Sequence, residues 1–259
     1  MNSKKTESHS CVYSQDDFFE KKCYSYNMNI LHEGLLRLGF DKGDFFGIKI
    51  LPIDELEAKM EKYIAILQEY NAKFDLINAD EHDEIAVKHI LDSLSGLPKI
   101  CDILSRAGEA DSLSLADIGS GAGLPGIPLS AALPQYKFTL IERMTKRCAF
   151  LNHCAAELEL KNVTVEENQA ERLEQKRFDL CVFRAFRPLE KKMAKVLLRI
   201  LKDGGCLAAY KAKKANIIEE MEGLPQKPKY EIFPLVVPFL TENAGTEEER
   251  ERNLVVIEK

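Results

Sequence analysis

The sequence contains no apolar run long enough to cross a membrane. Its N-terminus, Met1 to Ser10, is polar and lacks the apolar core of a secretory signal. We therefore expect a cytoplasmic protein that has no membrane partner. The sequence also lacks internal repeats. Its 259 residues suit one medium domain with an appendage, or two small domains, and either arrangement can bury a core large enough for an enzyme.

Closely spaced cysteine pairs are also missing. The seven cysteines are odd in number and scattered, and no two have the spacing Cys-x-x-Cys. Zinc sites and disulfide frameworks need cysteines in pairs or at regular spacing. We therefore expect reduced thiols in the core and no bound metal.

Positive charge is in deficit, because 36 Lys and Arg stand against 42 Asp and Glu, for a net charge of −6. This balance argues against nucleic-acid binding by bulk attraction, but a local basic face remains possible. Between Arg184 and Lys214 the acidic residues are only Glu190 and Asp203. The basic residues of this region are Arg184, Arg187, Lys191, Lys192, Lys195, Arg199, Lys202, Lys211, Lys213 and Lys214.

These basic residues fall into two groups. Lys191, Lys192 and Lys195 are as consistent with the solvated outer face of a helix as with a binding surface. Lys211, Lys213 and Lys214 are better candidates, because they follow the carboxyl end of a predicted strand, where backbone phosphates of a nucleic acid would approach.

Apolar periodicity divides the chain into three parts. Residues 1–27 are polar and without sustained periodicity, which predicts a flexible tail. Residues 28–110 form a predicted helical N-terminal module, and residues 111–259 a second domain. Within the module, apolar residues recur at steps of three and four from Ile53 to Phe74, which predicts a helix with one buried stripe.

A second helix is predicted from Asp83 to Leu94, with Gly96 and Pro98 ending it. His89 and Asp92 are three residues apart and therefore share a face of this helix. They can pair with each other or contact RNA, and a buried or capping hydrogen-bond pair is the favoured interpretation.

From Leu113 onwards apolar strands alternate with helical patterns, which indicates an α/β fold with a parallel sheet and helices on both faces. Two β-rich runs near the end predict an antiparallel end to this sheet. The predicted strands are Leu113 to Ile118, Lys137 to Ile141, Val163 to Glu166, Phe178 to Phe183, Cys206 to Tyr210, Tyr230 to Val237 and Asn253 to Glu258. Core-facing helices are predicted after Lys146 and from Leu189 to Leu201.

The stretch from Asp117 to Gly126 follows the first of these strands and holds four glycines in eight residues. A strand that ends in a tight turn and then opens a helix uses glycine in this way, because glycine has no Cβ. Pro125 suits the first turn of that helix. The pattern is consistent with a nucleotide-like cofactor at the turn and with a turn that binds nothing.

A carboxylate at the tip of the next strand favours the cofactor. Glu142 follows the strand from Lys137 to Ile141, where it can accept hydrogen bonds from two ribose hydroxyls. Two cofactor classes remain, a dinucleotide and S-adenosylmethionine. In a dinucleotide site the first glycine of Gly-x-Gly-x-x-Gly directly follows the strand, which here makes it Gly119. Counted from Gly119, the third glycine position of the motif is occupied by Leu124. This register favours S-adenosylmethionine.

The stretch DIGSGAGLPGIPL at Asp117 to Leu129, together with KHILDSL at Lys88 to Leu94, resembles a family of bacterial methyltransferases. These enzymes modify guanine N7 in small-subunit (16S) ribosomal RNA and are also called glucose-inhibited division protein B. The resemblance covers roughly residues 55 to 258. Further matching positions are Lys146-Arg147, Phe150-Leu151, Ala170-Glu171, Phe178-Asp179, Arg184-Ala185-Phe186, Lys211 and Asn253 to Ile257.

The resemblance implies a class I S-adenosylmethionine-dependent methyltransferase, which is Rossmann-like with a seven-stranded, mostly parallel sheet. It implies that Gly119 and Leu124 contact the cofactor, that Ala170 and Glu171 border its adenine end, and that Arg184 lines the site. The loop and strand-tip arguments add Gly121 and Glu142. For contact with RNA we expect His89, Lys211, Lys213 and Arg252.

The implied activity needs no catalytic base. Guanine N7 carries a lone pair and no proton, so it can attack the sulfonium methyl group directly, and the enzyme mainly aligns the two reactants. We assign no catalytic residue. The expected partner is 16S ribosomal RNA or the small ribosomal subunit, and we expect a monomer. The alternatives are a methyltransferase acting on a small molecule or protein, and a non-enzymatic nucleotide-binding module.

Overall fold

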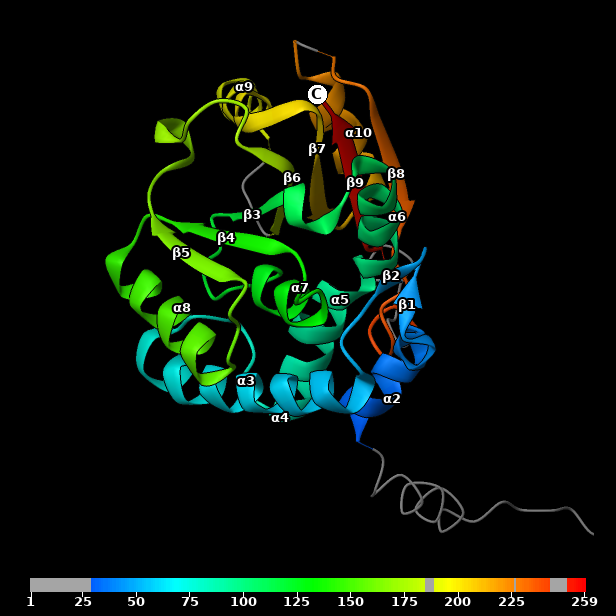
Figure 1. Ribbon diagram of the computed structural model, residues 1–259, viewed down its shortest axis with the longest axis vertical. Helices are drawn as coiled ribbons and strands as arrows, with labels where there is room; N and C mark the ends of the chain where they lie inside the picture. The colour runs from blue at the N-terminus through cyan, green and yellow to red at the C-terminus, as the bar shows by residue number, and fades with distance from the viewer. Residues whose placement is uncertain (1–28, 185–188, 226, 243–250) are drawn as a thin grey trace, which may run out of the picture.

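The protein is described here by a computed structural model that covers residues 29–184, 189–225, 227–242 and 251–259 (Figure 1). The predicted tail at residues 1–27 lies outside the described residues. A seven-stranded sheet forms the centre of the molecule, in the order β5-β4-β3-β6-β7-β9-β8. Its strands are β3 (Ser114–Ile118), β4 (Lys137–Glu142), β5 (Val163–Glu167), β6 (Phe178–Arg184), β7 (Leu201–Lys211), β8 (Tyr230–Pro234) and β9 (Asn253–Glu258).

The direction of the strands confirms the predicted topology. Strands β5, β4, β3, β6 and β7 run parallel, whereas β9 pairs antiparallel with both β7 and β8. This arrangement is that of a class I methyltransferase. The strand order reverses between β3 and β6, and in open α/β sheets ligands bind outside the carboxyl ends of the strands at such a point. The topology therefore places a candidate site at the ends of β3 and β6.

Helices cover both faces of the sheet, as the near-continuous apolar strands predicted. The residues of β3 alternate between the two cores, with Leu115 in the cluster on one face and Ala116 in the cluster on the other. The helices whose apolar residues join the Leu115 cluster are α6 (Leu97–Ala107), α7 (Gly126–Ala132) and α8 (Thr145–Glu157). Those that join the Ala116 cluster are α9 (Lys191–Ile200) and α10 (Lys214–Glu222).

The N-terminal elements pack against the Leu115 side. The long helix α3 has the predicted bounds, Ile53–Phe74, and lies along the lower edge of the view beneath α7 and α8 (Figure 1). It is preceded by α2 (Ile30–Arg37), the short 3-10 helix η1 (Phe40–Lys42) and a hairpin of β1 (Asp44–Phe45) and β2 (Ile48–Lys49). One hydrophobic cluster joins these elements to the sheet. The boundary near residue 110 stays a prediction.

The predicted helix from Asp83 to Leu94 is a chain of three segments. They are α4 (His82–Ile85), the π-helical η2 (Ala86–Leu91) and α5 (Asp92–Ser95). Gly96 ends α5, but the chain enters α6 at once, with Pro98 in its first turn, where no N–H donor is needed. The expectation that Gly96 ends this helix is therefore confirmed, whereas Pro98 belongs to the next helix. A Cβ at Gly96 would overlap the Tyr210 ring, so this glycine serves packing.

Two further expectations can be compared with the described residues. Cys101, Cys148, Cys154, Cys181 and Cys206 are all free and buried, so these five cysteines lie in the core as expected. Within the described ranges, no helix has the length and apolar character needed to span a bilayer.

Candidate cofactor site and adjoining pocket

The loop between β3 and α7 is pinned to the tip of β4. The N–H groups of Gly119 and Ser120 both donate to the carbonyl of Ile141, at 2.9 and 3.0 Å. Gly119, Gly121 and Gly123 have φ values of 72°, 59° and 88°, in the left-handed region that favours glycine. The predicted need for glycine in this turn is therefore real. Pro125 precedes α7 instead of lying in its first turn.

Space is available above one of these glycines. A Cβ at Gly123 would overlap the side chains of Ile127 and Tyr63, so that position is filled by protein. At Gly121 the nearest atom to an added Cβ is the Gly119 oxygen, 3.8 Å away. The loop thus presents bare backbone to open space at Gly121, which fits close approach by a cofactor.

Glu142 lies at the tip of β4, as predicted, and its carboxylate holds the loop. Its Oε2 accepts from the Gly121 N–H at 3.0 Å, and its Oε1 accepts from the N–H groups of Arg143 and Met144 at 2.8 and 2.9 Å. The side chain is buried. A carboxylate has about four acceptor sites, so three backbone bonds leave capacity for a ribose hydroxyl. Glu142 therefore fits a structural role in the loop as well as the predicted ribose contact.

Asp117 was not predicted as a site residue, although it opens the glycine stretch. Its Oδ2 accepts from Ser120 Oγ at 2.7 Å and from the Gly126 N–H at 3.0 Å. Its Oδ1 is buried and has no partner within the described residues. Burial raises the pKa of the Asp117 carboxyl to about 6. A buried acceptor that lacks a donor needs an explanation, and a bound ligand supplies one.

The remaining predicted cofactor residues lie at the same edge of the sheet. Ala170 and Glu171 begin the 3-10 helix η4 (Ala170–Arg172), directly after β5. The chain is held there because the Asn168 N–H donates to the Glu142 carbonyl at 3.0 Å. Leu124 and Ala170 are buried, and Glu171 is exposed. The structure therefore brings the glycine loop, Glu142 and the Ala170–Glu171 segment to the same edge of the sheet.

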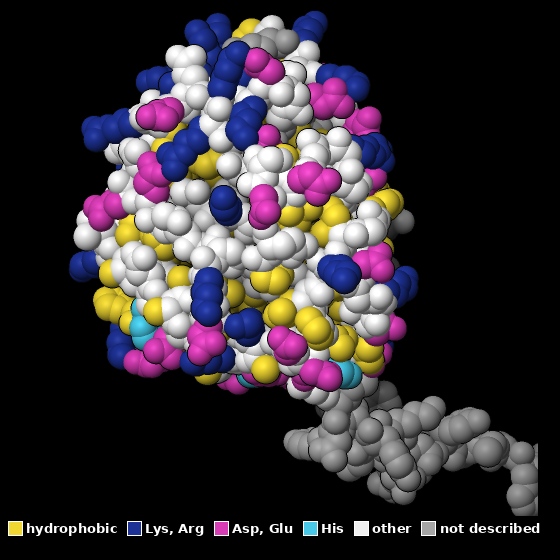
Figure 2. Space-filling view, in the orientation of Figure 1, with side chains coloured by type: hydrophobic (Ala, Val, Ile, Leu, Met, Phe, Trp, Pro, Cys, Tyr) yellow, Lys and Arg dark blue, Asp and Glu magenta, His cyan; other side chains and the backbone are white. Residues whose placement is uncertain are grey.

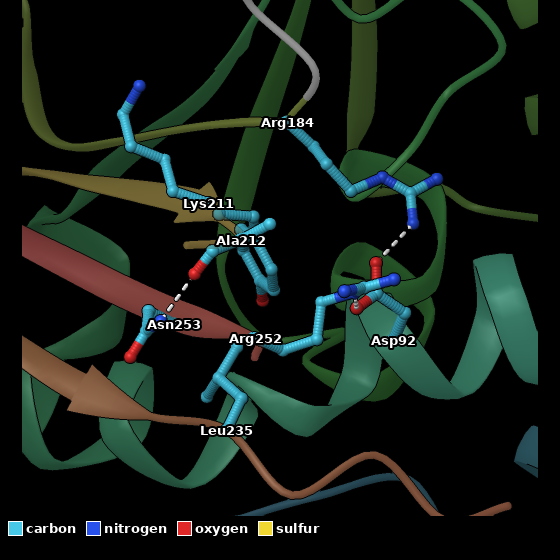
Figure 3. Close-up of a pocket in the computed structure, with 8 residues that line it drawn as sticks. Asp92, Arg184, Lys211, Ala212, Leu235, Arg252 and Asn253 are labelled. Atoms are coloured by element: carbon cyan, nitrogen blue, oxygen red, sulfur yellow. Dashed lines mark hydrogen bonds and ion pairs between the residues drawn. The ribbon is translucent and has the colours of Figure 1, made fainter. Parts of the chain in front are cut away.

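A pocket of about 200 Å³ adjoins this edge, at the ends of β6 and β7 and the start of β9 (Figure 3). Arg184 and Arg252 both point toward Asp92 in this view, whereas the Lys211 side chain extends away from it. The residues that line the pocket are Asp92, Arg184, Tyr210, Lys211, Ala212, Leu235, Arg252 and Asn253.

Asp92 joins the helical module to the sheet inside this pocket. Its Oδ2 lies 2.7 Å from Arg184 Nη1, and its Oδ1 lies 3.7 Å from Arg252 Nε. The side chains of Asp92 and Arg184 are only 9% and 14% exposed, so solvent screens this ion pair weakly. The family resemblance implied that Arg184 lines the site, and a single arginine in such a position is also consistent with a salt bridge. In the structure Arg184 lines the pocket and also forms an ion pair with Asp92, and this ion pair is mostly buried.

His89 lies beneath Arg184 on the π-helical η2. Its Nδ1 is 3.2 Å from Arg184 Nη2, and its buried Nε2 has no partner within the described ranges. Burial, followed by the charge of Arg184, lowers the pKa of His89 to about 4. His89 is therefore neutral near pH 7, and Nδ1 accepts a hydrogen bond from Arg184. The favoured partner for His89 was Asp92 on the same helix face, but the structure gives both residues Arg184 as their common partner.

The side chains of the other predicted RNA contacts differ in their exposure to solvent. Lys211 Nζ lies 2.8 Å from Glu220 Oε1 on α10, and both side chains are nearly buried. Lys213 is exposed at the start of α10, and Arg252 is half-buried at the pocket. Glu220, Tyr210 and Asn253 were not predicted as site residues, and of the three only Asn253 lies in a stretch that matches the family. Asn253 donates to the Ala212 carbonyl and holds the pocket wall.

Comparison with known proteins identifies the family to which the chain belongs. The sequence profile described as GidB, rRNA small subunit methyltransferase G, matches residues 56–254. The chain belongs to this family. The GidB family is the one that the glycine stretch and the motif at Lys88 to Leu94 resemble.

Relatives of the GidB family match most of the chain. A ribosomal RNA small subunit methyltransferase G from Treponema denticola is 34% identical over 255 residues, which cover 89% of this chain and 96% of that protein. The protein of the same name from Hydrogenovibrio crunogenus is 36% identical over 208 residues, covering 80% of this chain and 87% of its own length. The solved structure of the 4+2 cyclase SpnF has a TM-score of 0.51 at 14% identity, covers 79% of this chain and 96% of that one, and shows likeness of fold alone.

Proposed function

We propose that this protein transfers a methyl group from S-adenosylmethionine to N7 of a guanosine in small-subunit ribosomal RNA. Membership of the GidB family makes the chain an S-adenosylmethionine-dependent methyltransferase of ribosomal RNA. One observation carries the proposal. The glycine loop and the pocket lie at the same edge of the sheet, at the ends of neighbouring strands β3 and β6, and Arg184, the last residue of β6, lines the pocket.

The loop and the neighbouring strand ends offer the cofactor a set of protein contacts. Gly119, Gly121 and Leu124 would line it through the loop, and Glu142 would accept from its ribose. Ala170 and Glu171 would border the adenine. The buried Oδ1 of Asp117 supplies an acceptor for a further donor group on the cofactor. When bound, S-adenosylmethionine supplies an electrophilic methyl group on a sulfonium.

The pocket suits a nucleophile that needs no base. N7 of guanine attacks with its lone pair, and the base becomes positively charged. A bare cation beside it would oppose this step. Arg184 and Lys211 are instead neutralised by Asp92 and Glu220 at 2.7 and 2.8 Å. These two ion pairs reduce the positive field at the guanine, and orientation of the two reactants supplies most of the rate gain.

Recognition of the RNA is expected at the rim. N7 must be accessible, so the target guanosine is expected in a loop or another unstacked site. Lys213 and Arg252 are placed to meet phosphates beside the pocket. His89 and Lys211 are already paired inside the protein, so we expect them to support the pocket and to contact RNA only at its edge. We further propose that the protein acts as a monomer in the cytoplasm.

The test is a map of N7-methylguanosine in small-subunit ribosomal RNA from cells with and without this chain. One modified position should disappear without the chain and return when the purified protein and S-adenosylmethionine are added to the unmodified RNA. An unchanged map would reject the proposal. Calorimetry with S-adenosylmethionine alone tests the cofactor site separately from the RNA.

A further inference from the structure

Helix α9 carries cations along its solvent side. Its buried residues are Ala194, Leu197 and Ile200, and the helix contains no acidic residue. Lysine and arginine side chains gather in the upper part of the space-filling view, over the position of α9 in Figure 1 (Figure 2). We call Lys191, Lys192, Lys195 and Arg199 the α9 cationic face; the three lysines are exposed and Arg199 is half-buried.

The spacing of these residues disfavours the helix that carries them. Lys191 and Lys195, and Lys195 and Arg199, are like charges four residues apart, which destabilise a helix. Lys191 and Lys192 are also the first two residues of α9, where the helix dipole opposes positive charge. A local arrangement that works against its own helix indicates a function outside folding.

No ion pair inside the described part of the chain holds the three lysines, although Glu190 occupies the N-cap position at the start of α9. Nearby basic residues are paired, since Lys176 binds Asp203 at 2.5 Å and Lys202 binds Asp179 at 2.7 Å. Lys191, Lys192 and Lys195 form no ion pair across the described ranges. The net charge of the chain is −6, so this face is a local exception and not part of a general basic surface.

The α9 cationic face leads away from the pocket. Residues 185–190 alone separate Arg184 at the pocket from Lys191 at the start of α9. At its other end α9 is tied to the beginning of β6, because the N–H groups of Lys176 and Arg177 donate to the carbonyls of Arg199 and Ile200 at 3.1 and 2.8 Å. The helix therefore runs for about 15 Å from the carboxyl edge of the sheet toward the opposite edge.

We propose that the α9 cationic face binds the phosphate backbone of the ribosomal RNA that flanks the target nucleotide. The inference rests on the proposed function and adds a second contact, outside the pocket, that holds the RNA by charge and not by sequence. A polyanion is the occupant that the charge of the face selects, and it also relieves the repulsion within α9.

The test removes the three lysine charges together, as Lys191→Gln, Lys192→Gln and Lys195→Gln in one variant. Glutamine is a good helix former, so α9 is retained. The control variant combines Lys42→Gln, Lys49→Gln and Lys73→Gln, which are exposed lysines on the N-terminal elements. Both variants change the net charge equally. The RNA probe is small-subunit ribosomal RNA from cells that lack this chain.

We expect the α9 variant to bind this RNA about tenfold more weakly, and the slope of log affinity against log salt to fall by about 2, since each lost phosphate contact removes about 0.7. The KM for RNA should rise, with kcat and the affinity for S-adenosylmethionine unchanged. Without RNA, the variant should unfold at a higher temperature than the unmodified protein. The control variant should keep the original RNA affinity and salt slope.

Three results would overturn the inference. They are an unchanged salt slope in the α9 variant, an equal loss in the control variant, and a lower unfolding temperature in the α9 variant. Failure of the unmodified protein to methylate this RNA would instead reject the proposed function. The two failures are distinguished because each is read from a different protein sample.

Discussion

The hydroxyl of Tyr63 on α3 donates a hydrogen bond to the carbonyl of Ala122 in the glycine loop. Tyr63 is fully buried, and burial raises the pKa of its hydroxyl well above the usual value. The hydroxyl therefore stays protonated and remains a donor. This bond connects the N-terminal helix directly to the loop that is expected to hold the cofactor.

Tyr63→Phe should weaken cofactor binding. It leaves the Ala122 carbonyl without its donor, which costs about 1 to 3 kcal/mol when the group stays buried. We expect several-fold lower affinity for S-adenosylmethionine in calorimetry, with the fold kept. Tyr70→Phe is the matched control, because the Tyr70 ring packs on Phe150 but its hydroxyl makes no hydrogen bond within the described residues. Equal affinity in the two variants would contradict the prediction.

Glu142→Gln should reduce cofactor affinity more than stability. The amide keeps one acceptor oxygen. Its NH2 group, however, would face backbone N–H groups that now donate hydrogen bonds to the carboxylate at 2.8 to 3.0 Å. The loop contact to Gly121 and the ribose contact then compete for one oxygen. Calorimetry should show at least about tenfold weaker binding, as expected when a charged hydrogen-bond acceptor is lost. Unaltered affinity would remove Glu142 from the site.

Asp117→Asn should change how stability depends on pH. The pKa of Asp117 is about 6 in the folded protein and near 3.8 when unfolded, so the folded state holds the proton between these values. The carboxylate therefore costs stability above pH 6, by about 3 kcal/mol at most, and this cost disappears as the pH falls toward 4.

The asparagine variant has no such titration. Its stability relative to the unmodified protein should rise from pH 4 to above pH 6 in urea unfolding. Cofactor affinity should fall at the same time, because the acceptor Oδ1 is exchanged for a donor. A stability difference that stays constant with pH would show that the folded carboxyl titrates normally.

The ion pair between Asp92 and Arg184 should couple the helical module to the sheet. Asp92→Asn and Arg184→Gln should each destabilise the protein, since each leaves a nearly buried charge without its partner. The loss of unfolding free energy in the double variant should be smaller than the sum of the two single losses, by about 1 to 3 kcal/mol. Urea unfolding of the four proteins measures this difference, and additive losses would mean that the pair contributes no coupling.

Much of the fold could be predicted because its signals are local. The bounds of α3 follow from an apolar stripe at steps of three and four, and the parallel strands follow from apolar runs buried on both faces. The glycine loop and Glu142 were also predictable, because backbone sterics and a fixed loop length determine where they lie. Helix α10 and the continuation into α6 were missed. Gly96 ends α5 as predicted, but the chain enters α6 directly after it, and the missing Cβ of Gly96 makes room for Tyr210.

The sequence by itself determined the glycine loop, the strand-tip carboxylate and the family, because these depend on residue types at short, fixed spacings. Only the tertiary structure decided the partners across the pocket. Arg184 meets Asp92 from 92 positions away, and Tyr63 meets Ala122 from 59 positions away. Such pairs have no local pattern, because they arise where the packing of α3, η2 and α5 against the sheet brings distant side chains together.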